Sequence, residues 1–296
     1  MGVGQRRRDD GATVGFLHDA VYCAPTLDSL LAESTSGIAA HTTREAALTN
    51  ALFELVERDA FVLHWLRRHT PPLIDHRTIP AGVGARVDEV ELAGYDVRIA
   101  DLTTDLQIPA ALAIALNRCD GGRPALLLGA GAPADPLGAL TRGLTELVAA
   151  VRTWQKRPGA AAPVLGPEDV HRVAAHGLPY AHPAWRPAAE FLWSSEERLE
   201  IASIPTLTNA LEPTEVLRRI VARLAAHGIR VLGIDITTRE VAEAVVFVVR
   251  AVAPGLQPIG FGRHGMRHSG ARLRTWQPKD GSTWESALNI TPHPFP

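Results

Sequence analysis

Apolar residues recur at helical spacing between positions 43 and 68, which predicts one long helix early in the chain. Thr42, with Glu45 three residues later, has the spacing of a capping box, in which side chains satisfy the free amides of a helix start. Pro71 and Pro72 end the pattern, because proline lacks the amide donor that a helix interior needs. The apolar positions are Leu48, Ala51, Leu52, Leu55, Val56, Val62, Leu63 and Leu66.

A second pattern occurs twice along the chain. Residues 86–115 and 216–252 each predict a helix, a strand, an Asp-x-Thr-Thr turn and a second apolar strand. The turns are Asp101–Thr104 and Asp235–Thr238, where Asp and Thr side chains can bond local backbone amides. Two copies of one unit predict a pseudo-symmetric fold of the α/β (α+β) class.

The remaining segments of the chain show weaker patterns of secondary structure. Between the two units we expect a strand at 125–128 and a helix at 137–154. Residues 1–15 are rich in glycine and charge and are expected to be disordered, so that a single domain covers 16–296. The stretch 156–187 is rich in Pro, Ala, Gly and His, which predicts a long surface loop or insert.

The amino-acid composition favours a globular protein and argues against several other classes of protein. Of the 296 residues, 46% are hydrophobic and 21% are charged, as in ordinary globular proteins. The formal net charge of −2 gives no electrostatic reason to expect a nucleic acid or an anionic membrane as partner. Cys23 and Cys119 lie far apart, which argues against a disulfide scaffold or a cysteine zinc site. No apolar run reaches the ~18 residues of a membrane span, so we expect a cytoplasmic protein.

The candidate chemistry lies on the long helix. Asn50, Glu54, Glu57 and Arg58 are spaced three or four residues apart and therefore share one face. Paired carboxylates can hold Mg²⁺ through oxygen ligands, and a guanidinium can bind a phosphate with two hydrogen bonds. On spacing alone, a solvent-exposed stripe of ion pairs explains the same residues. Histidine metal ligands are not expected, since His171, His176, His264 and His268 have no carboxylate or cysteine companion.

The sequence segments before and within this helix resemble a known family signature. The segment Ser36–Ala47 followed by Leu52–Phe61 resembles that of the YcaO family, which runs small-Gly-x-Ala, a charged helix start and then E-L-x-E-R-D-A. Further matches follow in family order at Ile99–Pro109, Asp135–Glu146 and Val249–Pro258.

The resemblance implies an ATP-dependent cyclodehydratase. In such enzymes a Cys, Ser or Thr side chain of a ribosomal precursor peptide attacks the preceding amide, ATP phosphorylates the resulting oxygen, and phosphate leaves to give an azoline. Glu54 and Glu57 would bind Mg²⁺, Arg58 would contact the ATP phosphates, and Asn50 would occupy a polar position of the same site. Glu146 matches a recurring family glutamate, although a solvated helix charge explains it equally well. A leader-peptide-binding partner protein is also implied, often with a flavin dehydrogenase.

The chain ends on alternating prolines at 292–296, within an aperiodic tail from 288 to 296. This PxPxP ending resembles that of azoline-forming YcaO proteins, which implies that the carboxylate of Pro296 handles protons in the active site. Alternating prolines favour a stiff polyproline II segment. A disordered tail, or a ligand for an aromatic groove, would have the same composition.

Two departures from the family pattern leave a second function open. Active relatives carry a further glutamate motif in an N-terminal half, upstream of the match at Gly37, that we expect this chain to lack. The family usually has a glutamate eight residues before the position of Glu54, where this chain has Ala46, and Glu45 would point in another direction. The chain is therefore either a cyclodehydratase completed by other residues or a degenerate, non-catalytic scaffold of the same peptide-maturation pathway.

Overall fold

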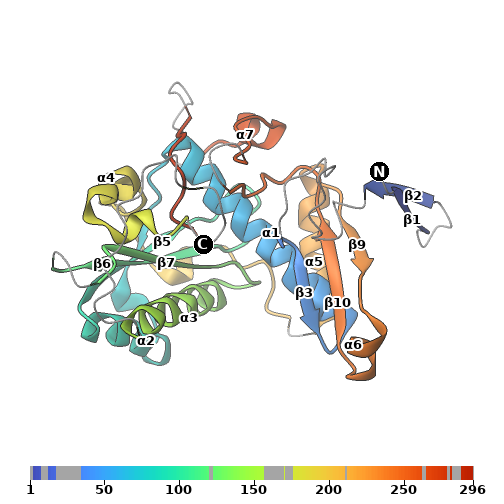
Figure 1. Cartoon of the computed structure of the whole chain (residues 1–296), viewed down its shortest axis with the longest axis horizontal. Helices are drawn as coiled ribbons and strands as arrows, with labels where there is room; N and C mark the ends of the chain where they lie inside the picture. Colours follow the sequence, from blue (N-terminus) through green and yellow to red (C-terminus); the bar gives the residue numbers. More distant parts are fainter. Residues whose placement is uncertain are drawn as a thin grey trace.

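One long helix, α1 (Arg44–Arg67), runs through the middle of the molecule from one β-sheet to another (Figure 1). Its N-cap is Thr43, whose hydroxyl accepts a hydrogen bond from the Ala46 amide at 3.2 Å, so the predicted cap at Thr42 is wrong by one residue. The helix ends at Arg68, which adopts a left-handed conformation with φ 51°. The computed structural model describes residues 3–7, 13–17, 35–119, 123–156, 170, 176–210, 212–261, 265–278, 281 and 288–295.

The larger sheet has five strands in the order β7-β6-β5-β4-β8, all antiparallel except β4 with β8. Its interior strand β6, between β7 and β5, is buried along its whole length, because helices pack on both faces of the sheet. Leu112 and Leu116 face the core around α1, whereas Ala113 and Ala115 face helices α2 and α3. The bounds are β4 Leu73–Ile74, β5 Tyr95–Asp101, β6 Ala111–Asn117, β7 Leu126–Gly131, β8 Arg198–Leu199, α2 Ala81–Leu92 and α3 Pro136–Gln155.

The smaller sheet has three antiparallel strands in the order β3-β10-β9. Helix α1 packs on this sheet and on helix α5, which places the first half of α1 at the smaller sheet and the second half at the larger one (Figure 1). The bounds are β3 Ile38–His41, β9 Leu232–Asp235, β10 Phe247–Val252, α5 Pro213–Ala226 and α6 Arg239–Glu243.

The predicted repeat is confirmed in both sheets. The order α2–β5–β6 in the larger sheet matches α5–β9–β10 in the smaller one. In the two Asp-x-Thr-Thr turns, the Asp101 carboxylate accepts the Thr103 amide at 2.9 Å and the Asp235 carboxylate accepts the Thr237 amide at 3.0 Å. The same side-chain bond therefore ends the first strand of each unit.

The repeat extends further than the sequence pattern predicts. In the larger sheet β6 pairs with β7, which leads into α3, and in the smaller sheet β10 pairs with β3, which leads into α1. Asp135 caps α3 by accepting the Gly138 amide at 2.8 Å, just as Thr43 caps α1. Each unit is therefore a helix, three strands and a long helix, with the last two elements of the second unit placed first in the chain.

Two other expectations differ from the structure. Strands β1 (Val3–Arg7) and β2 (Thr13–Leu17) pair within and beside the range expected to be disordered. The expected loop 156–187 includes Tyr180, which is fully buried in a series of short helical turns. Aromatic packing explains this second difference, because Tyr180 contacts the ring of Trp65 of α1. The turns and short helices are η2 His76–Thr78, η5 Pro179–Ala181, η6 Pro183–Trp185, α4 Arg186–Ala189, η7 Glu190–Leu192, η8 Ile201–Ser203 and α7 Ala271–Thr275.

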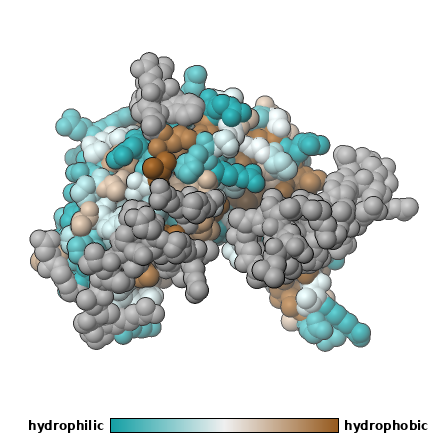
Figure 2. Space-filling view, turned by 45° about the horizontal axis from the view of Figure 1, so that its top comes forward, coloured by the Kyte–Doolittle hydropathy of each residue, from teal (hydrophilic) through white to brown (hydrophobic). Residues whose placement is uncertain are grey.

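The surface mixes polar and apolar residues. In the view of Figure 2, brown apolar residues lie in separate areas between teal hydrophilic ones. Within the part of the chain that the structure describes, no helix is both long and apolar enough to cross a membrane.

Candidate functional site

Glu54 is fixed by two contacts from different parts of the chain. One carboxylate oxygen lies 2.7 Å from Nη2 of Arg58, one turn later on α1, and the other accepts the amide of Gly37 at 3.0 Å. Arg58 also donates to the hydroxyl of Ser36. Because only 19% of the Glu54 side chain and 15% of the Arg58 side chain are exposed, this pair is not part of a solvated stripe.

A glycine makes the approach to Glu54 possible. Gly37 has φ +78°, and a Cβ at this position would lie 2.5 Å from the carbonyl oxygen of Ala251. A side chain would therefore both strain the backbone and collide with β10. The glycine of the Ser36-Gly37 signature is therefore needed for a structural reason, since it lets the chain pass close to α1 at the start of β3.

Glu57 is the buried acid of the charged face of the helix. It is buried, with 6% of its surface exposed, and its pKa is raised to about 8. Burial is the largest cause, followed by the negative charge of Glu146, while Arg142 and Arg58 act in the opposite direction. The carboxyl group of Glu57 is therefore mostly protonated at neutral pH in the protein alone. Buried acids with neighbouring charges of both signs are typical of functional sites.

Glu146 joins this group from helix α3. Its Oε2 accepts the amide of Ala130 in β7 at 3.3 Å, and partial desolvation of the carboxyl group raises its pKa, although the residue as a whole is exposed. Its charge raises the pKa of Glu57, so Glu146 acts on an acid of α1 from an exposed position on α3. Glu54 and Glu146 also stand at the same distance along the chain from the capping residues of their helices, at equivalent positions of the two units.

Sequence reasoning missed Arg142. This residue lies one turn before Glu146 on α3, and its positive charge lowers the pKa of both Glu57 and Glu146. The signal was present in the repeat, since Asn50 lies one turn before Glu54 in the equivalent helix. We call Glu54, Glu57, Glu146, Arg58 and Arg142 the charged cluster.

The charged cluster fits a nucleotide with its metal better than a free metal ion. Among the described residues, no three His, Cys, Asp or Glu side chains are arranged to hold a metal by themselves. Mg²⁺ is commonly bound by one or two carboxylates together with phosphate oxygens of the substrate. The buried Nε of Arg58 has no hydrogen-bond partner among the described residues, so a donor remains for an anionic ligand.

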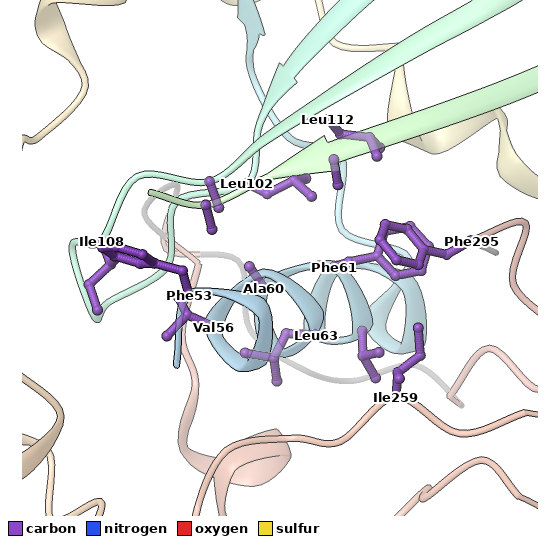
Figure 3. Close-up of a cluster of buried hydrophobic side chains, with 14 of the residues drawn as sticks. Phe53, Val56, Ala60, Phe61, Leu63, Leu102, Ile108, Leu112, Ile259 and Phe295 are labelled. Atoms are coloured by element: carbon purple, nitrogen blue, oxygen red, sulfur yellow. The ribbon is translucent and has the colours of Figure 1, made fainter. Parts of the chain in front are cut away.

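The remaining predicted site residues lie at the two ends of this region. Asn50 is half-buried one turn before Glu54. Pro296 lies outside the described residues, but Phe295 packs on Phe61 with ring centroids 4.7 Å apart (Figure 3). Phe61 is one turn beyond Glu57 on α1, so the tail reaches the part of the helix that carries the cluster.

The residues of the charged cluster lie within a segment that matches a known family. The model of YcaO cyclodehydratase, described as ATP- and Mg²⁺-binding, matches residues 9–257. The chain belongs to the YcaO family. An uncharacterized protein of Methanothermobacter thermautotrophicus is 29% identical over 231 residues, covering 77% of this chain and 57% of that protein. An uncharacterized protein from the tfuA 3′ region of Rhizobium leguminosarum bv. trifolii is 35% identical over 124 residues, 38% of this chain and 29% of that protein.

Solved structures share the fold. A heterocyclase in complex with substrate and cofactor has a TM-score of 0.71 and 23% identity, covering 92% of this chain and 34% of that chain. YcaO from Methanopyrus kandleri, bound with AMPPCP and Mg²⁺, has a TM-score of 0.66 and 20% identity, covering 86% and 64%. The E. coli microcin synthetase McbBCD complex with pro-MccB17 bound has a TM-score of 0.55 and 18% identity, covering 88% and 64%.

These comparisons confirm the predicted family and the mixed α/β fold of YcaO heterocyclases. The chain spans less than two thirds of the length of the relatives and structures named here.

Proposed function

We propose that this chain provides part of an ATP- and Mg²⁺-dependent cyclodehydratase that converts Cys, Ser or Thr residues of a ribosomal precursor peptide into azolines. The observation that carries the proposal is the charged cluster, in which the buried Glu57 and the half-buried pair Glu54–Arg58 of α1 lie within electrostatic reach of the exposed Glu146 and Arg142 of α3. Membership of a family described as ATP- and Mg²⁺-binding supports the same conclusion.

Each residue of the cluster has a role that its chemistry allows. Glu54 and Glu57 would hold Mg²⁺ together with phosphate oxygens of ATP, and Glu146 would belong to the nucleotide site as a further negative charge from α3. Arg58 would bind phosphate oxygens through its buried guanidinium, and Arg142 would add a second positive charge. Asn50 would donate a hydrogen bond at the N-terminal side of the site. Bound ATP supplies the phosphoryl group that turns the amide oxygen into a leaving group, so the residues act mainly by positioning and by neutralising charge.

Proton handling involves two groups of the chain. In the protein alone, Glu57 holds a proton at neutral pH, and a divalent cation beside it would favour the ionised form. The carboxylate of Pro296 would accept and return protons of the peptide substrate. The packing of Phe295 on Phe61 supports this role, because it brings the tail to the turn of α1 after Glu57.

The proposed activity requires other proteins. We propose a separate partner that binds the leader of the precursor peptide, and a flavin dehydrogenase that oxidises azolines afterwards. The similarity to a synthetase complex with a bound peptide precursor supports the general class of partner.

A second candidate function is a non-catalytic scaffold in the same pathway. Ala46 stands where the family usually has a glutamate, and it is buried, with 6% of its surface exposed. Glu45 is exposed and cannot replace that carboxylate without turning the helix. One metal ligand of the family pattern is therefore missing from α1.

Calorimetry with ATP and Mg²⁺ distinguishes the two functions. We expect magnesium-dependent ATP binding to the purified chain, together with a loss of about tenfold or more in affinity for Glu54→Gln and Arg58→Ala, because hydrogen bonds to charged groups contribute strongly. Glu45→Gln, an exposed change on the same helix, should bind as the unaltered chain does. Absence of ATP binding in the unaltered chain would support the scaffold instead.

A further inference from the structure

The tail, residues 288–295, is bonded to the rest of the chain at both of its halves. Asn289 donates its amide to the carbonyl of Leu66 at 2.8 Å and its Nδ2 to the carbonyl of Trp65 at 3.2 Å, whereas the proline-containing half accepts hydrogen bonds through its carbonyl oxygens. Pro292 and Pro294 have no backbone N–H. The backbone at these two residues can therefore form hydrogen bonds only through its carbonyl oxygens. Domains that recognise proline-rich segments use aromatic grooves for this purpose, in which ring surfaces contact the prolines.

The chain supplies donors to three consecutive tail carbonyls. Nε1 of Trp65 donates to the carbonyl of Thr291 at 2.9 Å, and the hydroxyl of Tyr180 donates to that of Pro292 at 2.7 Å. Nδ1 of His176 lies 3.1 Å from the carbonyl of His293. These donors come from α1 and from the segment around η5, far apart in the sequence, so the fold brings them together along the tail.

Ring packing covers the same stretch of the tail. His293 meets the edges of Phe61 and Phe261 with centroid distances of 5.8 and 5.5 Å, and Phe295 packs on Phe61 (Figure 3). Residues 292–295 are all buried, whereas Ile290 is 66% exposed. The buried residues of the tail are therefore 292–295 and Asn289, which is 3% exposed.

The walls of this site are held by contacts that do not involve the tail. Trp65 stacks on Phe61 at 6.1 Å and contacts Phe191 at 5.4 Å. Tyr180 contacts Trp185 at 5.4 Å and is fully buried. The donors are therefore fixed in place by their own neighbours, which lowers the ordering cost of binding a peptide.

We propose that Phe61, Trp65, His176, Tyr180 and Phe261 form a proline-peptide groove, and that the tail occupies it as a detachable ligand of the same chain. The groove binds the tail of its own chain, and a free peptide of the same sequence can replace it through the same carbonyl contacts. The proposal depends on the contacts above and not on azoline formation, so it can fail or succeed independently of the proposed function.

Cutting the folded chain tests whether the tail is detachable. A protease recognition sequence inserted after the exposed Gly281 allows the full chain to fold before the tail is released. We expect the fragment to stay bound after cleavage, and to exchange for a fluorescent synthetic peptide of residues 288–296 as followed by anisotropy. Unfolding of the protein on cleavage, or a lost fragment that excess peptide does not replace, overturns the proposal.

Matched substitutions test whether the named contacts hold the peptide. Tyr180→Phe removes one hydrogen bond to the tail and should weaken peptide binding about five- to tenfold. Tyr95→Phe, in a buried tyrosine of β5 away from the groove, should not change it. In the peptide, replacing the buried Phe295 with alanine should weaken binding about tenfold or more, whereas the same change at exposed Ile290 should not. Equal affinity for the two tyrosine variants would contradict the proposed groove.

Discussion

Asp59 of α1 and Arg272 of α7 form a buried ion pair, with Nη2 of Arg272 3.0 Å from Oδ2 of Asp59. Asp59 also accepts the backbone amide of Gln257 at 2.6 Å, and Arg272 reaches Asp105 at 2.7 Å. Burial raises the pKa of Asp59, and the charge of Arg272 opposes this shift. Because Asp59 directly follows Arg58, this pair ties the helix of the charged cluster to the segment that leads into the tail.

Arg272→Ala is expected to destabilise the protein by about 3–5 kcal/mol, since it leaves the fully buried Asp59 without its counter-charge. Urea unfolding measures this loss. Arg274→Ala is the matched control, because Arg274 lies on the same short helix and is exposed, and it should change stability by less than about 0.5 kcal/mol. A similar stability for both variants would show that the buried pair does not hold the C-terminal segment.

Glu146→Gln is expected to lower the pKa of Glu57 below about 8, because the charge of Glu146 is the second-largest cause that raises it. Arg142→Gln should raise the same pKa, since a compensating positive charge is lost. Carbon-13 NMR titration of the glutamate side chains, without divalent cations, measures both shifts. If neither variant moves the pKa of Glu57, the two helices do not share one site.

The sequence predicted the charged face of α1 but not its surroundings. Local spacing was enough to place Glu54, Glu57 and Arg58 on one side of a helix, because helical periodicity is a property of neighbouring residues. Local spacing cannot say which helix lies opposite. Arg142 and Glu146 reach the cluster only because β7 pairs with β6 within the larger sheet.

The repeat was recognised only in part for a related reason. The two Asp-x-Thr-Thr turns follow the same order of elements, so a search along the chain finds them. The strand and helix β3–α1 belong to the second unit by pairing with β10 but precede it in sequence. The equivalence of Glu54 and Glu146 therefore becomes visible only once the strand pairing is known.

The burial of the tail could not be derived from composition either. Proline alternation predicts a stiff segment but does not distinguish a free tail from a bound one. The deciding partners are Trp65 and Tyr180, which lie far from the tail in the sequence. Tyr180 itself lies in a stretch whose Pro, Ala and Gly content favours a surface loop.

Gly37→Ala is expected to destabilise the protein by about 2 kcal/mol or more, since it places a side chain at φ +78° and against the carbonyl of Ala251. It should also weaken ATP binding, because the backbone shift that relieves this collision moves the amide that donates to the Glu54 carboxylate. Thermal unfolding and calorimetry measure the two effects. Gly84→Ala, in helix α2 with nothing near the added Cβ, should instead stabilise the protein by up to about 1 kcal/mol.

The burial of His293 makes the stability of the docked tail depend on pH. Its pKa is lowered from 6.5 to about 3, first by burial and then by the neighbouring His176, whose ring lies 4.3 Å away. Between about pH 3 and pH 6.5 the unfolded chain therefore binds more protons at this imidazole than the folded chain does. The free energy of unfolding falls as the pH drops below 6.5, by at most about 1.4 kcal/mol per pH unit. The stability advantage of the unaltered chain over His293→Gln should shrink from pH 7.5 to pH 5, as measured by urea unfolding. Phe295→Leu is the control, because it changes tail packing without changing a titrating group. The difference in the free energy of unfolding between this variant and the unaltered chain should be the same at both pH values. An equally constant difference for His293→Gln would show that this imidazole is not buried in the neutral form.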